Sequence, residues 1–124
     1  MAADTALWTP TQDQIDAAPM TAFMKASAAK SGTVLSSYAE LHRWSIDDRE
    51  AFWGLVWDFC GIVGDKGERV LLDGDRMPGA TFFPDARLNF AENLLKKTGS
   101  AEAIVFRGED KVERRLSWNE LNAL

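Results

Sequence analysis

The stretch from Trp44 to Val63 constrains the fold most, because it is too apolar to remain in contact with water. It holds three of the five tryptophans, and its charged side chains are confined to residues 47–50 and Asp58. At 3.6 residues per turn, its apolar side chains form two adjacent lines on a helix: Phe52, Val56 and Phe59 on one, and Trp53, Trp57 and Cys60 on the other. The segments on either side must therefore cover this helix.

Residues that typically cap helices mark both ends of this stretch. Ser45 suits the N-cap position, with Asp48 three residues later as its partner in a capping box. Gly61 suits the position just beyond the C-terminus. Trp53 and Trp57 could stack a base or a sugar, but aromatic residues at helical spacing in an apolar run are more typical of a core. The stretch thus predicts architecture rather than chemistry.

Further capping patterns predict four more helices before residue 100. They are a short helix from Thr9, Pro10 and Gln12 to about Ala17, a second from Pro19 to Lys30 that stops at Gly32, a third that begins at the Ser37–Glu40 capping box, and a fourth from Asn89 and Glu92 to about Lys97. The fourth is expected to bury Phe90 and Leu94. It places Lys96 and Lys97 in its last turn, where cations suit the helix dipole.

Extended segments follow the central helix and dominate the end of the chain. Residues 70–72 suit a short strand, and residues 80–83 an extended segment that docks Phe82 and Phe83. Residues 103–106 and 112–116 suit two strands joined by a turn at 108–111, because the second run alternates apolar and charged side chains. Ser117–Glu120 is a capping box that begins a last helix. The chain stops about two turns later, which suggests a polypeptide cut ahead of a larger domain.

These elements predict an α+β protein in two parts. Residues 1–98 form a mostly helical N-terminal region with extended loops. Residues 99–124 contribute a β-hairpin and the start of a helix from a truncated second domain.

Composition excludes several functional classes. The 124 residues carry 19 acids and 14 bases, for a net charge of −5, and no basic face suits a nucleic acid. The single cysteine, Cys60, fits a reducing compartment, and we expect it to be a buried small hydrophobic residue. Residues 1–9 lack the apolar run of a signal peptide, and no run reaches the ~18 residues of a membrane span. A cytoplasmic protein that binds neither membrane nor nucleic acid is expected.

Few residues suggest chemistry by themselves. His42 is the only histidine, and no second metal ligand stands at a useful spacing. Residues 73–79 are rich in glycine, like a phosphate loop, but lack both the lysine-serine ending and a following helix, so a turn is favoured. Asp73, Asp75 and Asp85 could hold a metal but lack EF-hand spacing. We therefore assign no catalytic, cofactor-binding or metal-binding residue.

Several segments together resemble the N-terminal region of the acetoacetyl-CoA synthetase (acetoacetate–CoA ligase) family, in the acetyl-CoA synthetase-like group of the adenylate-forming (AMP-binding) superfamily. The matching segments are Leu7–Pro10, Tyr38–Ser45, Ala51–Trp53, Phe59–Val63 and, as the most specific, Phe82–Leu95. Residues 103–124 resemble the opening of the AMP-binding domain.

This resemblance implies an ATP-dependent acid–thiol ligase. The parent enzyme would use ATP, Mg²⁺ and CoA, with acetoacetate as the acid, in lipid metabolism. The family's phosphate loop, nucleotide contacts and C-terminal lysine lie outside these residues. The resemblance thus implies a segment that binds no cofactor and packs against the remainder of the AMP-binding domain.

Three functional hypotheses remain open. The chain could be a fragment of such a ligase that is inactive alone, a free-standing helical module that binds another protein through its aromatic surface, or a small enzyme with a metal at the three aspartates. Uncovered aromatic side chains would make the isolated chain partly unstable or self-associating.

Overall fold

The computed structural model describes residues 6–124, so the expectation for residues 1–9 lies partly outside the described part. Its elements run in the order α1 (Gln12–Asp16), α2 (Pro19–Ser31), α3 (Tyr38–Asp47), α4 (Arg49–Phe59), β1 (Leu71–Leu72), β2 (Thr81–Phe82), α5 (Phe90–Leu94), β3 (Glu102–Arg107), β4 (Glu113–Ser117) and α6 (Trp118–Asn122). Helices with two small antiparallel sheets confirm the α+β class.

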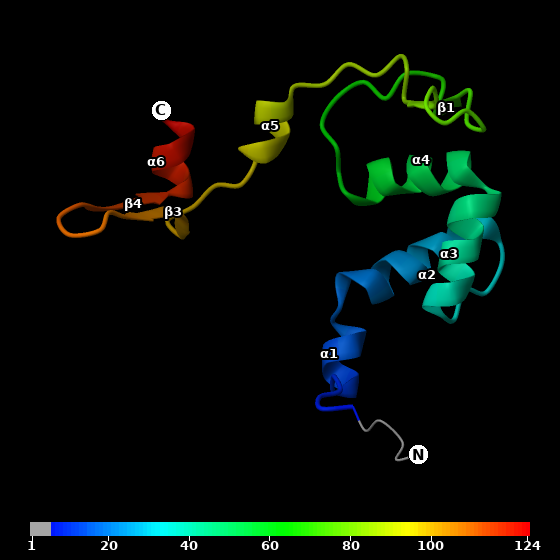
Figure 1. The fold of residues 1–124 in the computed structure, drawn as a ribbon, viewed down its shortest axis with the longest axis horizontal. Helices are drawn as coiled ribbons and strands as arrows, with labels where there is room; N and C mark the ends of the chain where they lie inside the picture. The colour runs from blue at the N-terminus through cyan, green and yellow to red at the C-terminus, as the bar shows by residue number, and fades with distance from the viewer. Residues whose placement is uncertain (1–5) are drawn as a thin grey trace.

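The elements form two units joined by an extended segment (Figure 1). The first, called here the helical unit, contains α1–α4 and the β1–β2 ribbon. The second, the hairpin unit, contains β3, β4 and α6 and lies at the opposite end of the molecule. The segment between them carries α5.

Local capping residues set most of the helix ends. Ser37 and Ser117 form complete capping boxes with Glu40 and Glu120, as predicted. α2 begins with Pro19 at its first position and ends at Gly32, which has a left-handed φ of 69°. The first helix starts two residues later than predicted, because Thr11 rather than Thr9 caps it, with Gln14 as its partner.

The central stretch is two helices rather than one, so the prediction of an N-cap at Ser45 was wrong. Ser45 lies inside α3, where its hydroxyl donates to the carbonyl of His42 at 2.7 Å. Asp48 ends α3 and caps α4, accepting a hydrogen bond from the amide of Ala51 at 3.2 Å. The predicted glycine stop is confirmed, because Gly61 has a φ of +60° just after the C-cap Cys60.

The two apolar lines of α4 pack on different neighbours. Phe23 of α2 meets Phe52 and Phe59 edge-on, with ring centroids 5.7 and 5.1 Å apart. On the adjacent line, Trp53 contacts Phe82 at 5.3 Å and Trp57 contacts Phe83 at 5.0 Å. The prediction that flanking segments cover this helix is therefore confirmed, including the docking of both phenylalanines.

The β1–β2 ribbon holds these two phenylalanines in place. Leu71 pairs with Phe82, and Leu72 with Thr81. The loop between the strands folds back on α4, where Arg49 donates to the carbonyl of Gly74 and to Asp75, both at 2.6 Å. The ribbon is thereby attached to α4 both by its phenylalanines and by the hydrogen bonds of Arg49.

α5 differs from its prediction in length and burial. Asn89 caps it as expected, accepting from the amides of Ala91 and Glu92. The helix ends at Leu94 instead of reaching Lys97. Phe90 is 75% exposed and Leu94 60% exposed, so the expected burial of these side chains was wrong. A five-residue helix presents too few apolar side chains on one face to bury them against a neighbouring unit.

The hairpin unit has the predicted strands. Ile104 pairs with Leu116, Val105 with Arg115 and Phe106 with Arg114. α6 packs back on this hairpin, and the amide of Trp118 donates to the carbonyl of Ala101 at 3.1 Å.

Little of the described chain is buried. Within residues 6–124, only Leu41 and Ser27 fall in the buried class. The accessible surface is 9919 Å², whereas a compact monomer of this mass exposes about 6,600 Å². The molecule is therefore open, with its apolar side chains shared among several partly covered contacts.

Candidate functional site

The polar residues considered for chemistry do not converge. His42 is exposed and stacks on Tyr38, with ring centroids 6.1 Å apart. Within the described part of the chain, no three His, Cys, Asp or Glu side chains are grouped closely enough to hold a metal ion. Cys60 is exposed, so its predicted burial was wrong: it lies at the C-cap of α4, beyond the contact with Phe23.

Each of the three candidate aspartates is paired with its own arginine. Asp75 lies 2.6 Å from Arg49. Asp73 lies 3.2 Å from Arg76. Separate ion pairs of this kind satisfy the carboxylates individually and leave no common set of oxygens facing one ion.

The third aspartate belongs to a forked ion pair at the surface. Arg69 donates through Nε to one oxygen of Asp85 at 2.7 Å and through Nη2 to the other. These hydrogen bonds lower the pKa of Asp85, and the arginine charge adds to the effect. They also raise the pKa of Arg69. The pair ties residues before β1 to residues after β2, which is a structural role.

The glycine-rich loop of residues 73–79 is a turn, as predicted. Asp73 has a φ of 54°, and Arg76 donates its amide to the carbonyl of Asp73 at 2.9 Å. β2 follows this loop, whereas in a phosphate loop a helix begins directly after the glycines.

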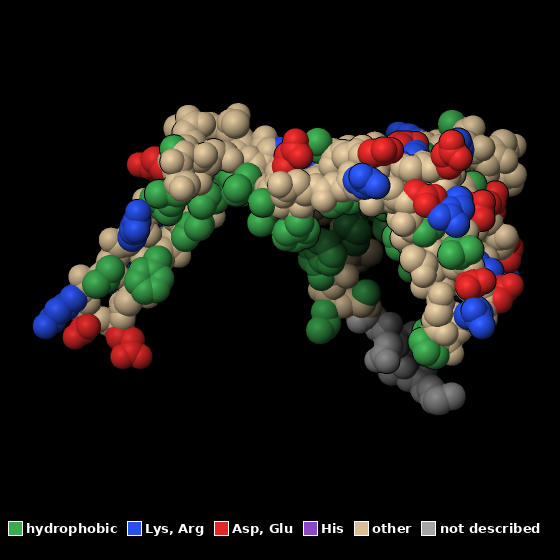
Figure 2. Space-filling model, turned by 90° about the horizontal axis from the view of Figure 1, so that it is seen from above, with side chains coloured by type: hydrophobic (Ala, Val, Ile, Leu, Met, Phe, Trp, Pro, Cys, Tyr) green, Lys and Arg blue, Asp and Glu red, His purple; other side chains and the backbone are tan. Residues whose placement is uncertain are grey.

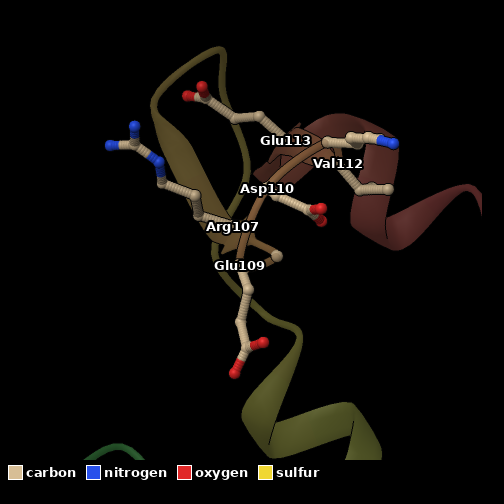
Figure 3. Close-up of a pocket in the computed structure, with 7 residues that line it drawn as sticks. Arg107, Glu109, Asp110, Val112 and Glu113 are labelled. Atoms are coloured by element: carbon tan, nitrogen blue, oxygen red, sulfur yellow. The ribbon is translucent and has the colours of Figure 1, made fainter.

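A polar hollow of about 270 Å³ lies inside the turn of the β3–β4 hairpin, lined by residues 107–113. Its charged side chains point in different directions, with Arg107 toward the upper left of the view and Glu109 downward (Figure 3). Glu113 is already bonded to Arg115, at 2.8 and 2.9 Å. Diverging charges cannot bind one ligand together, so this hollow is the inside of a turn.

An apolar surface is the feature with the clearest functional meaning. Hydrophobic side chains gather along the hollowed side of the arched molecule, from the hairpin unit across to the helical unit (Figure 2). We define the apolar surface as the exposed hydrophobic residues around α5 and the hairpin: Leu88, Phe90, Leu94, Ile104, Val105, Phe106 and Val112. Exposure of several large hydrophobic side chains in one region is typical of an interaction surface.

β3 supplies the centre of this surface. Ala103, Ile104, Val105 and Phe106 make it apolar on both faces, which is typical of a strand covered on both sides. β4 instead carries three charged residues in succession, Glu113 to Arg115, and Arg115 forms exposed ion pairs with Glu113 and Glu102. The sequence of β3 is thus typical of a strand covered on both faces, and that of β4 is typical of a strand in contact with solvent. In this structure, Ile104, Val105 and Phe106 of β3 are exposed.

The side chains that fix the fold between distant segments were missed by sequence reasoning. Arg49, Asn93 and Lys96 all make hydrogen bonds to residues at least 25 positions away. Asn93 lies inside the segment that carries the family resemblance, but nothing in its local pattern shows what it binds.

Comparison with known proteins identifies the relatives of this chain. Residues 38–94 match the family model described as acetyl-coenzyme A synthetase N-terminus. The chain is 50% identical over 124 residues to the acetoacetyl-coenzyme A synthetase of Rhizobium meliloti, covering 100% of this chain and 19% of that protein. It is 38% identical over 110 residues to a malonamoyl-CoA synthetase of Penicillium aethiopicum, covering 82% of this chain and 15% of that protein.

A solved structure has the same fold. The acetoacetyl-CoA synthetase from Streptomyces lividans matches with a TM-score of 0.79 and 35% identity, covering 94% of this chain and 19% of that one. Residues 38–94 are therefore an acetyl-coenzyme A synthetase N-terminal region. The chain resembles the N-terminal region of acetoacetyl-CoA synthetase along its whole length. The chain spans about a fifth of the length of these acetoacetyl-CoA synthetases.

The helices of the described part are short. Within residues 6–124, none is long and apolar enough to cross a bilayer. The longest of them, α2, has 13 residues.

Proposed function

We propose that this chain is the N-terminal part of an acetoacetate–CoA ligase. The whole enzyme would convert acetoacetate, ATP and CoA into acetoacetyl-CoA, AMP and pyrophosphate. The observation that carries the proposal is the 50% identity to an acetoacetyl-coenzyme A synthetase across all 124 residues. The matches to further acetoacetyl-CoA synthetases, including a solved structure, also support acetoacetate as the acid.

The proposed reaction proceeds through an acyl-adenylate. A carboxylate is a poor electrophile, so its oxygen first attacks the α-phosphorus of ATP and pyrophosphate leaves. The resulting mixed anhydride carries AMP as a good leaving group. The sulfur of CoA then attacks the acyl carbon, and AMP departs as the thioester forms. ATP, Mg²⁺ and CoA are cofactors and substrates of the whole enzyme in this proposal.

The proposed role of these residues is packing rather than chemistry. The three candidate aspartates are engaged in separate ion pairs, and no residue of this part is proposed to bind substrate or cofactor. The apolar surface would be covered by the rest of the AMP-binding domain. This occupant is supported by the length of the relatives, about five times that of this chain.

The experiment compares two polypeptides. One is the 124-residue chain, and the other is the product of the complete reading frame that encodes it. We expect acetoacetate-dependent exchange of pyrophosphate into ATP from the second polypeptide only. Exchange by the 124-residue chain in a clean preparation would overturn the packing role. A complete product that uses malonamate and ignores acetoacetate would overturn the proposed acid.

A free-standing interaction module is the second candidate, because the apolar surface could equally bind a separate protein. It predicts that the native reading frame ends near Leu124. In either case, the proposed compartment is the cytoplasm, which the single cysteine supports.

A further inference from the structure

The backbone that follows α4 forms a tight turn, in which the carbonyls of Cys60 and Gly61 remain available to a side-chain donor. The amide of Gly61 donates to the carbonyl of Asp58 at 3.1 Å, and the amide of Ile62 donates to that of Trp57 at 3.2 Å. This is the hydrogen-bond pattern of a Schellman motif. The last turn of α4 contains no basic residue, so nothing within the helix compensates the negative end of its dipole.

Lys96 supplies the missing cation from beyond α5. Its Nζ donates to the carbonyl of Cys60 at 3.3 Å and to that of Gly61 at 3.1 Å. The sequence predicted this lysine in the last turn of its own helix. It instead stabilises the end of a helix about 35 residues earlier, where an ammonium group is favoured.

Asn93 makes a second attachment two residues further along. Its Oδ1 accepts from the amide of Val63 at 2.8 Å, and its Nδ2 donates to the carbonyl of the same residue at 2.8 Å. Nδ2 also donates to the carbonyl of Asn89 at 2.9 Å. A carboxamide has both a donor and an acceptor, so it can satisfy both polar groups of one peptide residue.

Further contacts extend this attachment in both directions. Asp65 and Arg87 exchange two backbone hydrogen bonds of 2.8 Å. On the other side, Nδ2 of Asn122 donates to the carbonyl of Lys97 at 2.8 Å, and the amide of Gly99 donates to Asn119 at 2.8 Å. Residues 93–99 are thus tied to α4 at one end and to α6 at the other.

Apolar packing does little to hold α5 itself. Phe90 and Leu94 are its large hydrophobic side chains, and both are mostly exposed. The position of α5 on the end of α4 therefore depends on polar contacts, and Asn93 and Lys96 make four of them. We call these two residues and the segment they bind, residues 60–63, the α4–α5 joint.

We propose that Asn93 and Lys96 are positioning residues that fix the orientation of the hairpin unit relative to the helical unit. They act by clamping the exit of α4 onto the segment that leads to β3. The proposal concerns the geometry of this chain and does not depend on the proposed ligase activity.

The first test measures the distance between the units by electron paramagnetic resonance. Spin labels are placed through Glu50→Cys on α4 and Asp110→Cys in the hairpin turn, in a Cys60→Ser background of the full 124-residue chain. Excess unlabelled chain dilutes any pairs between molecules. We expect one narrow distance, which is lost in the Asn93→Ala/Lys96→Gln variant while helical circular dichroism is retained.

A matched control removes a lysine elsewhere. Lys25→Gln changes the same charge on α2 and should leave the narrow distance intact. A distribution that is unchanged in the joint variant, or already broad in the labelled parent chain, would overturn the proposal.

The second test reports on the joint alone and needs no labels. Hydrogen exchange at the amide of Val63 should accelerate about tenfold in Asn93→Ala, because one protein hydrogen bond is lost. Asn93→Asp keeps the acceptor and loses the donor, so this amide should stay protected while the distance between the units still broadens. Equal protection of Val63 in the parent chain and Asn93→Ala would show that the joint does not form.

Discussion

The helical unit and the hairpin unit begin their helices in the same way but are held together differently. Ser37 caps α3 and Ser117 caps α6 with the same pair of capping-box hydrogen bonds. In the helical unit, Phe23, Phe52 and Phe59 then pack on one another. In the hairpin unit, Ile104, Val105 and Phe106 are exposed along β3. Local signals thus suffice to form secondary structure in both units, but the helical unit packs its aromatic side chains against one another, whereas β3 leaves most of its apolar side chains exposed.

Removing the ring at the centre of the helical unit should have the largest effect on stability. Phe23→Ala loses both edge-on contacts to α4, and we expect the free energy of unfolding to fall by about 2–4 kcal/mol. Urea denaturation followed by circular dichroism measures the change. Phe90→Ala is the matched control, because the side chain is 75% exposed and should change stability little. Equal effects of the two substitutions would contradict the difference between the units.

Lowering the hydrophobicity of β3 should alter association rather than folding of the helical unit. The exposed apolar surface predicts that the 124-residue chain associates with itself as its concentration rises. Phe106→Ser should shift sedimentation toward the monomer, with the melting of α2 and α4 unchanged. A parent chain that sediments as a single monomer at all concentrations would show that the surface is not adhesive.

A smaller effect is expected where a polar contact fixes the β1–β2 ribbon on α4. Arg49→Met removes the donor to the carbonyl of Gly74 and should cost about 1 kcal/mol. The ion pair to Asp75 should add little, since that carboxylate is 96% exposed. In Arg49→Met, we also expect a protease to cleave the loop of residues 73–79 faster than in the parent chain. Arg76→Met serves as the control, because its pair with Asp73 is local and exposed.

The smallest effect concerns pH and compares the two capping boxes directly. Hydrogen bonds from Ser36 and Ser37 lower the pKa of Glu40 below its ordinary value of 4.5, and those from Ser117 lower the pKa of Glu120. A lowered pKa in the folded state means that the stabilisation is present above pH 4.5 and is lost as pH falls through the folded pKa. Carboxyl carbon shifts in NMR titrations should therefore give both midpoints below 4.5.

The consequence of protonation should differ between the units. α3 is packed on α4, so protonating Glu40 should lower the stability of the helical unit as a whole. Protonating Glu120 should loosen only α6. Glu40→Gln and Glu120→Gln should reduce the respective acid dependence, and equal global effects from both variants would be inconsistent with this difference.

The features predicted correctly from the sequence were those set by neighbours along the chain. Asn89, Ser37 and Ser117 were identified as caps because the residue types and their spacing are sufficient. The N-caps predicted at Thr9 and Ser45 were wrong, because Thr11 and Asp48 cap these helices instead. In both cases another acceptor side chain lies within three residues of the predicted cap.

Burial and long-range contacts were less accessible to sequence reasoning. Helical periodicity placed Phe52 and Trp53 on adjacent lines of a helix. It could not show that Cys60 and Phe90 would be exposed, because exposure depends on where neighbouring segments end. The absence of an assigned catalytic residue remains an expectation of the sequence. The attachments made by Arg49, Asn93 and Lys96 depend on where the chain returns in space, and a single sequence carries no direct signal for that.

The double role of Asp48 has a consequence for how this region can change length. One residue ends α3 and caps α4, with no loop between the two helices to absorb extra chain. Each added residue turns a helix by about 100°. An insertion between Trp44 and Phe52 would therefore move the phenylalanine line to the side now occupied by the tryptophan line, and bring Ala51, Leu55 and Asp58 toward α2. The spacing of these two aromatic residues is thus as strict a requirement for this unit as their identity.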